Sequence, residues 1–594
     1  MEMKGRLFDC VEYQLTHFPK EDMLVAKENG VWKGYSTIQV KEMADNLSAG
    51  LLELGISGNN MTAEGADKIG IISNNRPEWI ITDIAVQQIG AILIPIYPTT
   101  SSIEIAFILN EAEVKYMFVG DEALFNKIND IKHNIPSVKG IYSFSPVNNV
   151  SNWKEILSLE TTENKEKVQI LKSKIPTSHT ATIIYTSGTT GTPKGVMLSH
   201  DSIYANVRIS KDSFPFEDRP DWKVLSFLPL NHILERMVTY IYLFSGNSIY
   251  YAESLDTIGD NLREVKPNGF TTVPRLLEKV FEKIIQKGNE LKGIKRRIFF
   301  WSVSVAGKYD NQVKNNLLYN LQLAVANKLV FAKWREALGG HVSFIVTGGA
   351  ACQQKLLRIF NAANIPVYEG YGPTENSPVV CVNRKTPKYH KFGTVGPPLN
   401  EIEVKIAADG ELLVNGPCIM QGYYKQPDLT AKTIINGWLH TGDIGVWDKG
   451  NIKITDRKKE LFKTSGGKYV APQPIENKFK ESPFIEQMMV IGADQKFVAA
   501  LIIPSFSTLK EWLSDKNISF ETNHKVISNP IVLSHFEDII KEYNTHFNQV
   551  EQIKKFILLP DEWGIETGEM TPKLSLRRKV VTEKFSVEIN SIYK

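Results

Sequence analysis

Few cysteines, no long uncharged apolar run and almost no net charge mark this sequence. Among its 594 residues are only four cysteines, none with the CxxC spacing of a zinc site: Cys10, Cys352, Cys381 and Cys418. Such scattered cysteines also argue against a disulfide framework, so we expect a protein of the reducing cytoplasm. The first 18 residues hold no apolar core followed by a small-residue cleavage site, and we expect no signal peptide.

The lack of long apolar runs argues against a transmembrane helix. The most lipid-like stretch, Trp79–Pro98, is interrupted by Asp83, Gln87 and Gln88, and the stretch Met237–Phe244 is too short to cross a bilayer. A net charge of +3 argues against a nucleic-acid partner, because such proteins usually carry a stronger basic bias. Neither observation determines the oligomeric state.

Short apolar strands alternate with helices over the first three quarters of the chain. We expect a helix over 77–88, with Pro77 in its first turn, and strands at 69–73, 91–97, 181–186, 224–228, 247–252 and 343–347. This alternation predicts an α/β fold with a large N-terminal domain of layered, largely parallel sheets and helices. Because ligands of such sheets bind beyond the carboxyl ends of the strands, the loops there form the candidate site.

A second change of pattern comes near residue 456. Apolar strands at 488–492 and 497–504, a long helix over 531–549 and an apolar run at 554–560 suffice for a small α+β domain. We therefore predict an N-terminal domain over 1–456 and a mobile C-terminal lid domain over 457–594, with a hinge at their boundary.

The segment 280–338 has no proline and is expected to be mainly helical. Its patch 292–301 joins cations to aromatic residues, which is typical of a solvated helix face beside a buried one. The alternative is a peripheral contact with the inner face of the membrane.

The densest local signal is a loop rich in glycine and threonine that follows the strand 181–186. The loop Thr186–Gly195 holds three glycines, five Ser or Thr residues and Lys194. Glycines let backbone N–H groups converge on an anion, hydroxyls add donors, and a lysine adds a charge suited to phosphate. This composition predicts a polyphosphate site rather than a plain surface turn. It is not a Walker A loop, since Pro193 stands where that pattern needs glycine.

These residues resemble the phosphate loop of the adenylate-forming superfamily, which includes acyl-CoA synthetases, luciferases and the adenylation domains of peptide synthetases. Four further segments resemble that superfamily and occur in its order, at 347–351, 368–375, 438–443 and 456–463. Each segment alone has an ordinary reading as a turn or a surface ion pair. Five in the family's order make coincidence a poor explanation.

The resemblance implies roles for individual residues. Tyr371 would lie against the adenine and Thr374 near the α-phosphate, while Thr186 and Glu375 would hold Mg²⁺, an ion that takes hard oxygen ligands and shares phosphates. Asp443 and Arg457 would hold the ribose. The nucleotide-binding positions implied by the resemblance are Thr186, Ser187, Gly188, Thr189, Thr190, Gly191, Lys194, Gly348, Gly349, Ala350, Glu369, Gly370, Tyr371, Gly372, Thr374, Asp443, Arg457, Lys459 and Lys463.

Within this superfamily, the chain most resembles the long-chain fatty acyl-CoA synthetases. Residues 225–238 contain their His-x-x-Glu-Arg pattern, at His232, Glu235 and Arg236. The resemblance implies that His232, Thr272 and Gly349 contact the acyl substrate; the alternative for His232 is a hydrogen-bonded histidine at a helix start. The preferred chain length is not readable, because hydrophobic pockets discriminate by only about 1–3 kcal/mol per methylene.

The family's chemistry implies a ligase that converts a fatty acid, ATP and coenzyme A into acyl-CoA, AMP and pyrophosphate. In this chemistry the protein supplies positioning and charge stabilisation, and the residues that the resemblance implies for this are Lys194, Glu375, Arg457 and a C-terminal lysine. At that lysine the chain departs from the family's pattern, because Ser575 holds the usual position and Lys573 lies two residues upstream. We assign the role to Lys573, with Lys463 as a second candidate.

Three other functions compete with this interpretation. The acyl group could pass to a carrier protein or another acceptor instead of coenzyme A, although no carrier domain is apparent after Lys579. A non-catalytic acyl-nucleotide-binding protein would bind ATP without releasing pyrophosphate. A kinase or P-loop ATPase would release ADP or phosphate, and Pro193 makes it the poorest of the three.

Overall fold

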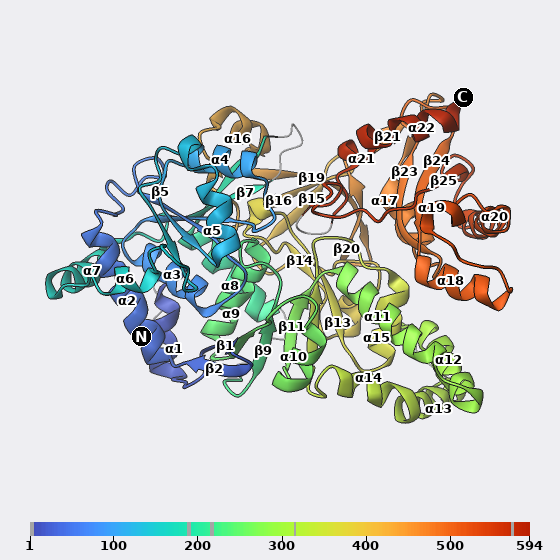
Figure 1. Ribbon diagram of the computed structural model, residues 1–594, viewed down its shortest axis with the longest axis horizontal. Helices are drawn as coiled ribbons and strands as arrows, with labels where there is room; N and C mark the ends of the chain where they lie inside the picture. The colour runs from blue at the N-terminus through green and yellow to red at the C-terminus, as the bar shows by residue number, and fades with distance from the viewer. Residues whose placement is uncertain (1–4, 187–191, 214–218, 314–315, 572–574) are drawn as a thin grey trace.

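The computed structural model describes residues 5–186, 192–213, 219–313, 316–571 and 575–594. Sheets of eight, seven and five strands lie in the N-terminal part, while a three-stranded sheet and a two-stranded ribbon lie in the C-terminal region. The C-terminal region, orange to red, occupies the right of Figure 1, and the larger part fills the rest. The predicted α/β class, with a smaller C-terminal α+β region, is confirmed. No helix of the described residues is long and apolar enough to span a bilayer.

The seven-stranded sheet contains the earliest predicted strands. β3, β4, β5, β6 and β7 run parallel, β8 joins β7 antiparallel, and β17 joins β8 antiparallel. All residues of β3 and β4 are buried, and strands buried on both faces read as continuous apolar runs. The strands are β3 (Lys68–Ile72), β4 (Ile92–Ile96), β5 (Val114–Val119), β6 (Gly140–Ser143), β7 (Thr180–Thr186), β8 (Lys194–Ser199) and β17 (Gly422–Tyr423).

The eight-stranded sheet has a parallel centre with an antiparallel strand at each edge. Its order is β14-β13-β12-β11-β9-β10-β1-β2. In that order the strands are β14 (Cys381–Val382), β13 (Val367–Tyr371), β12 (Phe344–Thr347), β11 (Gly269–Thr272), β9 (Lys223–Ser226), β10 (Ser248–Tyr251), β1 (Leu24–Glu28) and β2 (Val31–Tyr35). The strands predicted near 224, 247 and 343 are confirmed here.

Helices α3 (Pro77–Gln88) and α9 (Ile233–Phe244) lie between these two sheets, because they share one core with strands of both. Every residue of α3 is buried, polar ones included. The two helices are joined by a buried ion pair, in which the Arg236 guanidinium donates to Asp83. The hydroxyl of Tyr240 and the amide of Gln87 also donate to the Asp83 carboxylate, at 2.7 and 2.6 Å. The Arg236 of the sequence pattern therefore stabilises the helical layer.

A five-stranded antiparallel sheet over residues 403–457 follows, and the sequence had not predicted it. Its longest strands, β19 and β20, form a hairpin in which Asp443 pairs with Arg457. Its strands are β15 (Glu403–Ile406), β16 (Glu411–Asn415), β18 (Ile434–Ile435), β19 (Trp438–Asp448) and β20 (Asn451–Arg457).

The C-terminal region has its own apolar cores around a three-stranded sheet. The two predicted strands and the long helix are present, although the helix ends at Asn544, earlier than expected. The elements are β21 (Phe462–Lys463), β22 (Tyr469–Val470), α17 (Pro472–Phe479), β23 (Ile485–Ile491), β24 (Val498–Pro504), α18 (Phe506–Asp515), α20 (Pro530–Asn544), β25 (Ile553–Leu558), α21 (Arg578–Lys584) and α22 (Ser586–Tyr593).

The predicted helical segment forms α11 (Pro274–Asn289), α12 (Gly293–Gly307), α13 (Leu317–Ala326), a π-helical turn (Asn327–Phe331) and α14 (Ala332–Ala337). Several polar contacts join this segment and its surroundings to the C-terminal region. The Arg275 guanidinium donates to the Glu486 carboxylate, Asn289 donates to Glu511 at 3.0 Å, and the Lys355 ammonium donates to the Glu481 carbonyl at 3.1 Å. The two regions are thus held together in this arrangement.

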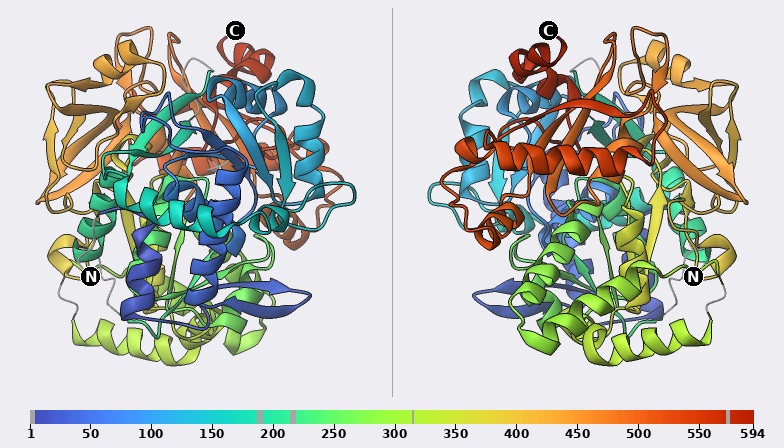
Figure 2. Two further views of the ribbon diagram at one scale, coloured as in Figure 1. Left: turned by 90° about the vertical axis from the view of Figure 1, so that its left-hand side faces the viewer. Right: turned by 90° about the vertical axis from the view of Figure 1, so that its right-hand side faces the viewer.

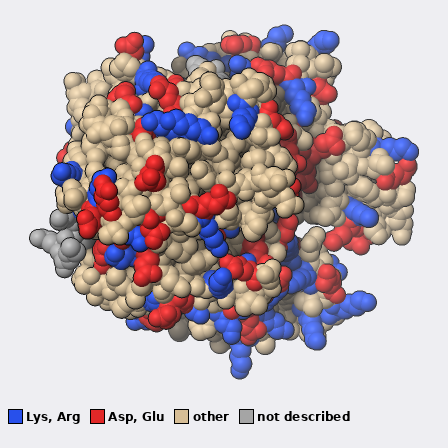
Figure 3. Space-filling model, turned by 60° about the vertical axis from the view of Figure 1, so that its left-hand side comes forward, with Lys and Arg blue, Asp and Glu red and all other residues tan. Residues whose placement is uncertain are grey.

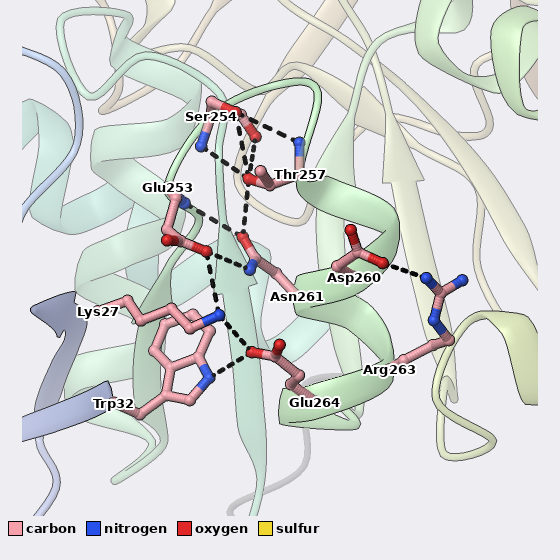
Figure 4. A network of polar contacts seen from close by, with 9 residues as sticks. All are labelled: Lys27, Trp32, Glu253, Ser254, Thr257, Asp260, Asn261, Arg263 and Glu264. Carbon is pink, nitrogen blue, oxygen red and sulfur yellow. Dashed lines mark hydrogen bonds and ion pairs between the residues drawn. The ribbon is translucent and has the colours of Figure 1, made fainter. Parts of the chain in front are cut away.

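A surface network attaches the β1–β2 hairpin to α10 (Ile258–Val265), as Figure 4 shows. The Lys27 ammonium donates to Glu264 at 2.8 Å and to Glu253 at 3.2 Å, and the Trp32 indole N–H donates to Glu264 at 2.9 Å. These bonds raise the pKa of Lys27 and lower the pKa of Glu264. Because the network lies on the surface and contains none of the predicted site residues, we interpret it as a structural clip.

Candidate functional site

A cavity of about 2360 Å³ lies where the strand ends of the N-terminal part face the C-terminal region. All five predicted segments contribute to its lining, the last two through residues 439–443 and 457–460, and residues of the C-terminal segment 570–579 contribute as well. The space-filling view of Figure 3 shows a groove beside the lobe at its right, and a surface on which positive and negative side chains are mixed. Residues far apart in the sequence therefore share one chamber.

The predicted phosphate loop connects two paired strands. Thr186 at the end of β7 pairs with Lys194 at the start of β8, and both side chains line the cavity. The predicted residues Ser187, Gly188, Thr189, Thr190 and Gly191 lie outside the described residues. The hairpin thus fixes both ends of the loop at the cavity.

Lys194 lies in a cluster of polar groups. Its ammonium lies 5.3 Å from the centroid of the Tyr423 ring, and the Tyr423 hydroxyl donates to Oε1 of Glu375 at 2.8 Å. Partial burial and the positive charge of Lys459 lower the pKa of Lys194, while Glu375 opposes this shift. A lysine, a carboxylate and a phenol are therefore gathered at the loop.

The turn after β12 and the strand β13 form another wall. Gly348, Gly349 and Ala350 follow β12 and line the cavity, and Gly349 has a φ of +81°, which favours glycine. Gly372 allows a close approach of the chain, because a Cβ there would lie 1.8 Å from the carbonyl oxygen of Pro378. Gly370 and Thr374 line the same wall.

Glu369 is a buried member of this wall. One of its oxygens accepts the backbone N–H of Cys352 at 3.1 Å. Burial raises the pKa of Glu369 to about 8, so the carboxyl is protonated at neutral pH. A neutral acid suits hydrogen bonding better than binding of a cation.

Tyr371 at the end of β13 forms a polar group with Asp443 and Arg457 of the β19–β20 hairpin. The Tyr371 hydroxyl donates to Oδ2 of Asp443 at 2.7 Å, and Nε of Arg457 lies 3.5 Å from its Oδ1. Burial raises the pKa of Asp443, and the charge of Arg457 opposes this shift. Together these groups offer a carboxylate beside an aromatic ring, an arrangement suited to a nucleoside.

Next to this group, the chain leaves the five-stranded sheet. Asp456 is buried and accepts the backbone N–H groups of Arg457 at 2.6 Å and of Gln473 at 3.3 Å. Lys459 lines the cavity. Lys463 is not among the lining residues; its ammonium lies 4.7 Å from the centroid of the exposed Tyr469 ring. The structure thus brings Lys459, but not Lys463, to the cavity.

The C-terminal segment enters the cavity as a short hairpin. The backbone N–H of Thr571 donates to the Ser575 carbonyl at 2.8 Å, and the Ser575 N–H donates to the Thr571 hydroxyl at 3.2 Å. Both residues line the cavity, while Lys573 between them lies outside the described residues. An ion pair of 3.8 Å between Arg577 and Glu104 of α4 (Ser102–Glu111) anchors the hairpin.

The His-x-x-Glu-Arg pattern has a structural function at each position. His232 is the N-cap of α9, where its Nδ1 accepts the Leu234 N–H at 3.1 Å, and its side chain also lines the cavity. Glu235 is buried and accepts the hydroxyls of Ser226, at 2.7 Å, and of Thr271. Both interpretations of His232 are thus compatible with its position.

Thr272 lies behind the cavity wall rather than in it. Its side chain is buried in β11, and its carbonyl accepts the Gly348 N–H at 3.4 Å. Gly349, the third residue predicted to contact the acyl substrate, does line the cavity.

The donor set fits a magnesium ion that is shared with a phosphate ligand. Thr186 and Glu375 both face the cavity and both supply hard oxygens. Among the described residues, no group of three or more His, Cys, Asp or Glu side chains is arranged to hold a metal by itself. Two protein oxygens suit an ion whose other ligands come from phosphate and water.

Several residues of the site were missed by the sequence reasoning. Tyr423 contacts Lys194 and Glu375, and Lys458 donates to Glu411 at 2.8 Å beside the loop that carries Asp443. Tyr423 stands 48 residues after its hydrogen-bond partner Glu375, in a segment without a motif of its own. Only the strand pairing β17–β8 signals that it belongs to the site.

Residues 11–424 match the family described as AMP-binding enzyme, and residues 460–594 match the AMP-binding enzyme C-terminal domain. Long-chain-fatty-acid–CoA ligase FadD15 of Mycobacterium bovis is 31% identical over 573 residues, which are 95% of this chain and 93% of that protein. Long-chain-fatty-acid–CoA ligase 5 of Mus musculus is 32% identical over 597 residues, 96% and 85% of the two chains.

Among solved structures, the adenylation domain of a carboxylate reductase from Mycobacterium chelonae superimposes with a TM-score of 0.74. It is 19% identical, and the match covers 99% of this chain and 91% of that one. At this identity the likeness concerns the fold.

Proposed function

This chain belongs to the AMP-binding enzyme family and is an adenylate-forming ligase, and on that premise we propose that it activates long-chain fatty acids and transfers them to coenzyme A. Two relatives about 31–32% identical over nearly the whole chain are named long-chain-fatty-acid–CoA ligases, which supports this substrate and this acceptor. The products would be acyl-CoA, AMP and pyrophosphate.

One observation carries the proposal: five segments spread over nearly 400 residues line a single cavity. They supply a phosphate-loop hairpin, a carboxylate with a nearby lysine, and an aromatic ring beside a second carboxylate. A nucleoside triphosphate needs these three kinds of group, for its phosphates, its metal and its nucleoside. An acid held in the same cavity would lie close to the α-phosphate.

We assign the residues as follows. The loop 186–191 and Lys194 would hold the β- and γ-phosphates, Thr374 the α-phosphate, and Asp443 with Arg457 the ribose. The ring of Tyr371 would lie against the adenine, near 348–350. Thr186 and Glu375 would hold Mg²⁺, which would supply positive charge to stabilise the leaving pyrophosphate.

The reaction would proceed in two displacements. A carboxylate oxygen of the fatty acid forms a bond to the α-phosphorus, the bond to the bridging oxygen breaks, and pyrophosphate leaves. The thiol of coenzyme A then forms a bond to the acyl carbon, loses its proton, and AMP leaves with the electron pair. The protein holds the groups in line and stabilises the charge on the phosphates.

Lys573 would neutralise charge on the α-phosphate and the carboxylate during the first displacement. Supporting this, Thr571 and Ser575, which flank the segment that contains Lys573, both line the cavity. Lys463 is the weaker candidate, because its ammonium lies over Tyr469.

We also infer that residues 1–456 and 457–594 form two domains with a hinge at their junction. The match to the C-terminal family begins at residue 460, close to that junction. The chemistry favours a cytoplasmic enzyme, since its substrates ATP and coenzyme A are found there.

The test is an assay of purified protein with ATP, Mg²⁺ and acids from acetate to oleate, with and without coenzyme A. Pyrophosphate, AMP and acyl-CoA should appear together with long-chain acids. Lys573→Ala should lower adenylation by at least about a hundredfold, a few kcal/mol of lost charge stabilisation. Lys541→Ala, at an exposed position of α20, is the matched control and should leave the rate unchanged.

The competing functions predict different products. Adenylate without thioester would move the proposal to a carrier protein or another acceptor. ATP binding without pyrophosphate would favour a non-catalytic binding protein, and ADP would favour a kinase.

A further inference from the structure

Helix α13 exposes a row of large apolar side chains. Leu317 is 88% exposed, Leu318 67% and Leu321 63%, and Val325 and Leu329 continue the row into the π-helical turn. In a helix, positions three to four residues apart lie on one face, so these side chains form a stripe. A stripe of this kind on the outside of a protein requires an explanation.

These residues are a cluster and not part of an even scatter. The described residues include 21 exposed large hydrophobic side chains, and eight of them fall within residues 294–329. We call these eight side chains the α12–α13 surface; they are Ile294, Trp301, Val313, Leu317, Leu318, Leu321, Val325 and Leu329. A stretch of about one seventeenth of the chain thus holds more than a third of its exposed large hydrophobic residues.

The segment that follows the stripe is firmly packed against the core. Val330, Phe331 and Trp334 are buried in the core that also contains Phe299 of α12. The rings of Phe331 and Trp334 lie 4.8 Å apart, and those of Phe299 and Trp334 lie 6.1 Å apart. α13 itself is mostly exposed, with a single buried residue at its C-terminal end, so the apolar stripe is presented by an outer helix that is anchored where it joins this packed segment.

The stripe lies on an outer edge of the molecule. In both views of Figure 2, the yellow-green helix formed by this segment runs along the bottom, below the rest of the protein. An outermost helix of this kind meets a flat surface more easily than it fills a groove.

The surroundings of the stripe are strongly basic. Between Glu290 and Glu336 the sequence has a single acidic residue, Asp310, and nine basic ones: Lys292, Lys295, Arg296, Arg297, Lys308, Lys314, Lys328, Lys333 and Arg335. Lys295, Arg296 and Arg297 are exposed, and among the described residues none of the three has an ion-pair partner. The local charge is therefore not neutralised by the protein itself.

We propose that the α12–α13 surface docks on an anionic lipid bilayer, with the leucines in the boundary between headgroups and acyl chains and the cations on the headgroups. An exposed apolar stripe rimmed by Lys and Arg is the pattern by which a helix lies in a membrane interface. This inference goes beyond the proposed function and does not depend on it, because it uses only the exposed side chains.

A second copy of the chain fits this surface less well. Two copies meeting through it would bring their exposed basic residues together, among them Lys295, Arg296 and Arg297 of each copy, and like charges across an interface oppose association. An anionic bilayer has the opposite charge and an apolar layer below it, so it satisfies both features at once.

Docking here would leave about the length of α11 between the lipid and the cavity. Pro274 and Arg275, at the start of α11, line the cavity, and α11 ends beside α12. The 16 residues of α11 span about 24 Å at 1.5 Å per residue.

The test is co-sedimentation of the full chain with vesicles of phosphatidylcholine alone and with vesicles that also contain about 30% phosphatidylglycerol. We expect binding to the anionic vesicles, weakening as salt is raised. Leu317→Ser/Leu318→Ser/Leu321→Ser should lower the partition coefficient by at least about tenfold. Lys295→Gln/Arg296→Gln/Arg297→Gln should lower it by on the order of a hundredfold on anionic vesicles only, at about 1 kcal/mol for each charge.

The matched control is Val31→Ser/Val446→Ser/Val587→Ser, which removes three exposed apolar residues scattered elsewhere. It should bind vesicles like the unaltered protein, and circular dichroism should show that all variants are folded. Failure of the unaltered protein to bind anionic vesicles, or equal binding by the leucine variant, would overturn the proposal. A dimer in sedimentation equilibrium that the leucine variant converts to a monomer would overturn it in favour of a second copy.

Discussion

Replacing Arg236 with Met is expected to destabilise the protein by about 3–5 kcal/mol. The side chains of Arg236 and Asp83 are completely buried between α9 and α3. Arg236 Nε donates to Asp83 at 2.8 Å, and Tyr240 and Gln87 provide the other donors. After the substitution the carboxylate keeps two neutral donors but loses the opposite charge, so most of the cost is that of an uncompensated buried charge.

A loss of this size should be visible in thermal denaturation followed by circular dichroism. Each kcal/mol shifts Tm by about 2–4 °C for a domain of 150–250 residues, so the expected decrease is roughly 6–20 °C. Urea denaturation should show the same loss of stability.

Two further variants separate burial from pairing as the cause. Arg208 forms a two-pronged ion pair with Glu401 on the surface, both bonds at 2.7 Å, and Arg208→Met should cost only about 0–1 kcal/mol. Asp83→Leu/Arg236→Met removes both buried charges and should be much more stable than Arg236→Met alone. A cost below about 1 kcal/mol for Arg236→Met, or a double variant as unstable as the sum of the single ones, would refute this reasoning.

Three other predictions follow from the described contacts. Burial raises the pKa of Glu235 to about 7. The stability that its protonated carboxyl contributes is therefore complete below pH 4.5 and is lost, by up to about 3 kcal/mol, as the pH rises through 7. Glu235→Gln should have a flatter stability profile in urea denaturation between pH 5 and 8. Asp443→Asn removes the charge facing Tyr371 and Arg457 and should weaken ATP binding by about 10–150-fold in calorimetric titration, whereas unchanged affinity would remove Asp443 from the nucleotide site. Tyr423→Phe keeps the ring over Lys194 and loses only one hydrogen bond, so adenylation should decrease by about 2–10-fold, and a much larger loss would mean that the hydroxyl touches a reacting group.

The parallel sheets could be predicted from the sequence because their strands are local apolar runs. The helix expected over 77–88 occurs at those residues, and β4 and β12 differ from expectation by a residue at the ends. Pro77 starts the helix, and strands buried on both faces need no alternation to be recognised. These signals lie within a few neighbouring residues.

The antiparallel sheet over 403–457 could not be predicted in this way. Its strands β15 and β18 are short and half exposed, and their pairing is set by contacts distant along the chain. Similarly, nothing near Asp83 indicates that its partner lies 153 residues later in Arg236. Contacts of this kind depend on tertiary packing, which local patterns do not encode.

The candidate site was predictable where a motif carries it. Thr186, Lys194, Glu375 and Asp443 reach one cavity as the resemblance implied. Tyr423 had no motif and was missed, and the roles of all these residues stay predictions until they are tested. Lys573, the residue on which the chain departs from its family, lies outside the described residues, so its role depends on the adenylation assay.

The most direct test of the central claim is exchange of radiolabelled pyrophosphate into ATP without coenzyme A. An enzyme that forms an acyl-adenylate reversibly must catalyse this exchange, and only when an acid is present. We predict exchange that requires a long-chain acid and Mg²⁺, and equal amounts of AMP and acyl-CoA once coenzyme A is added. No acid-dependent exchange, together with release of ADP or phosphate, would contradict the account.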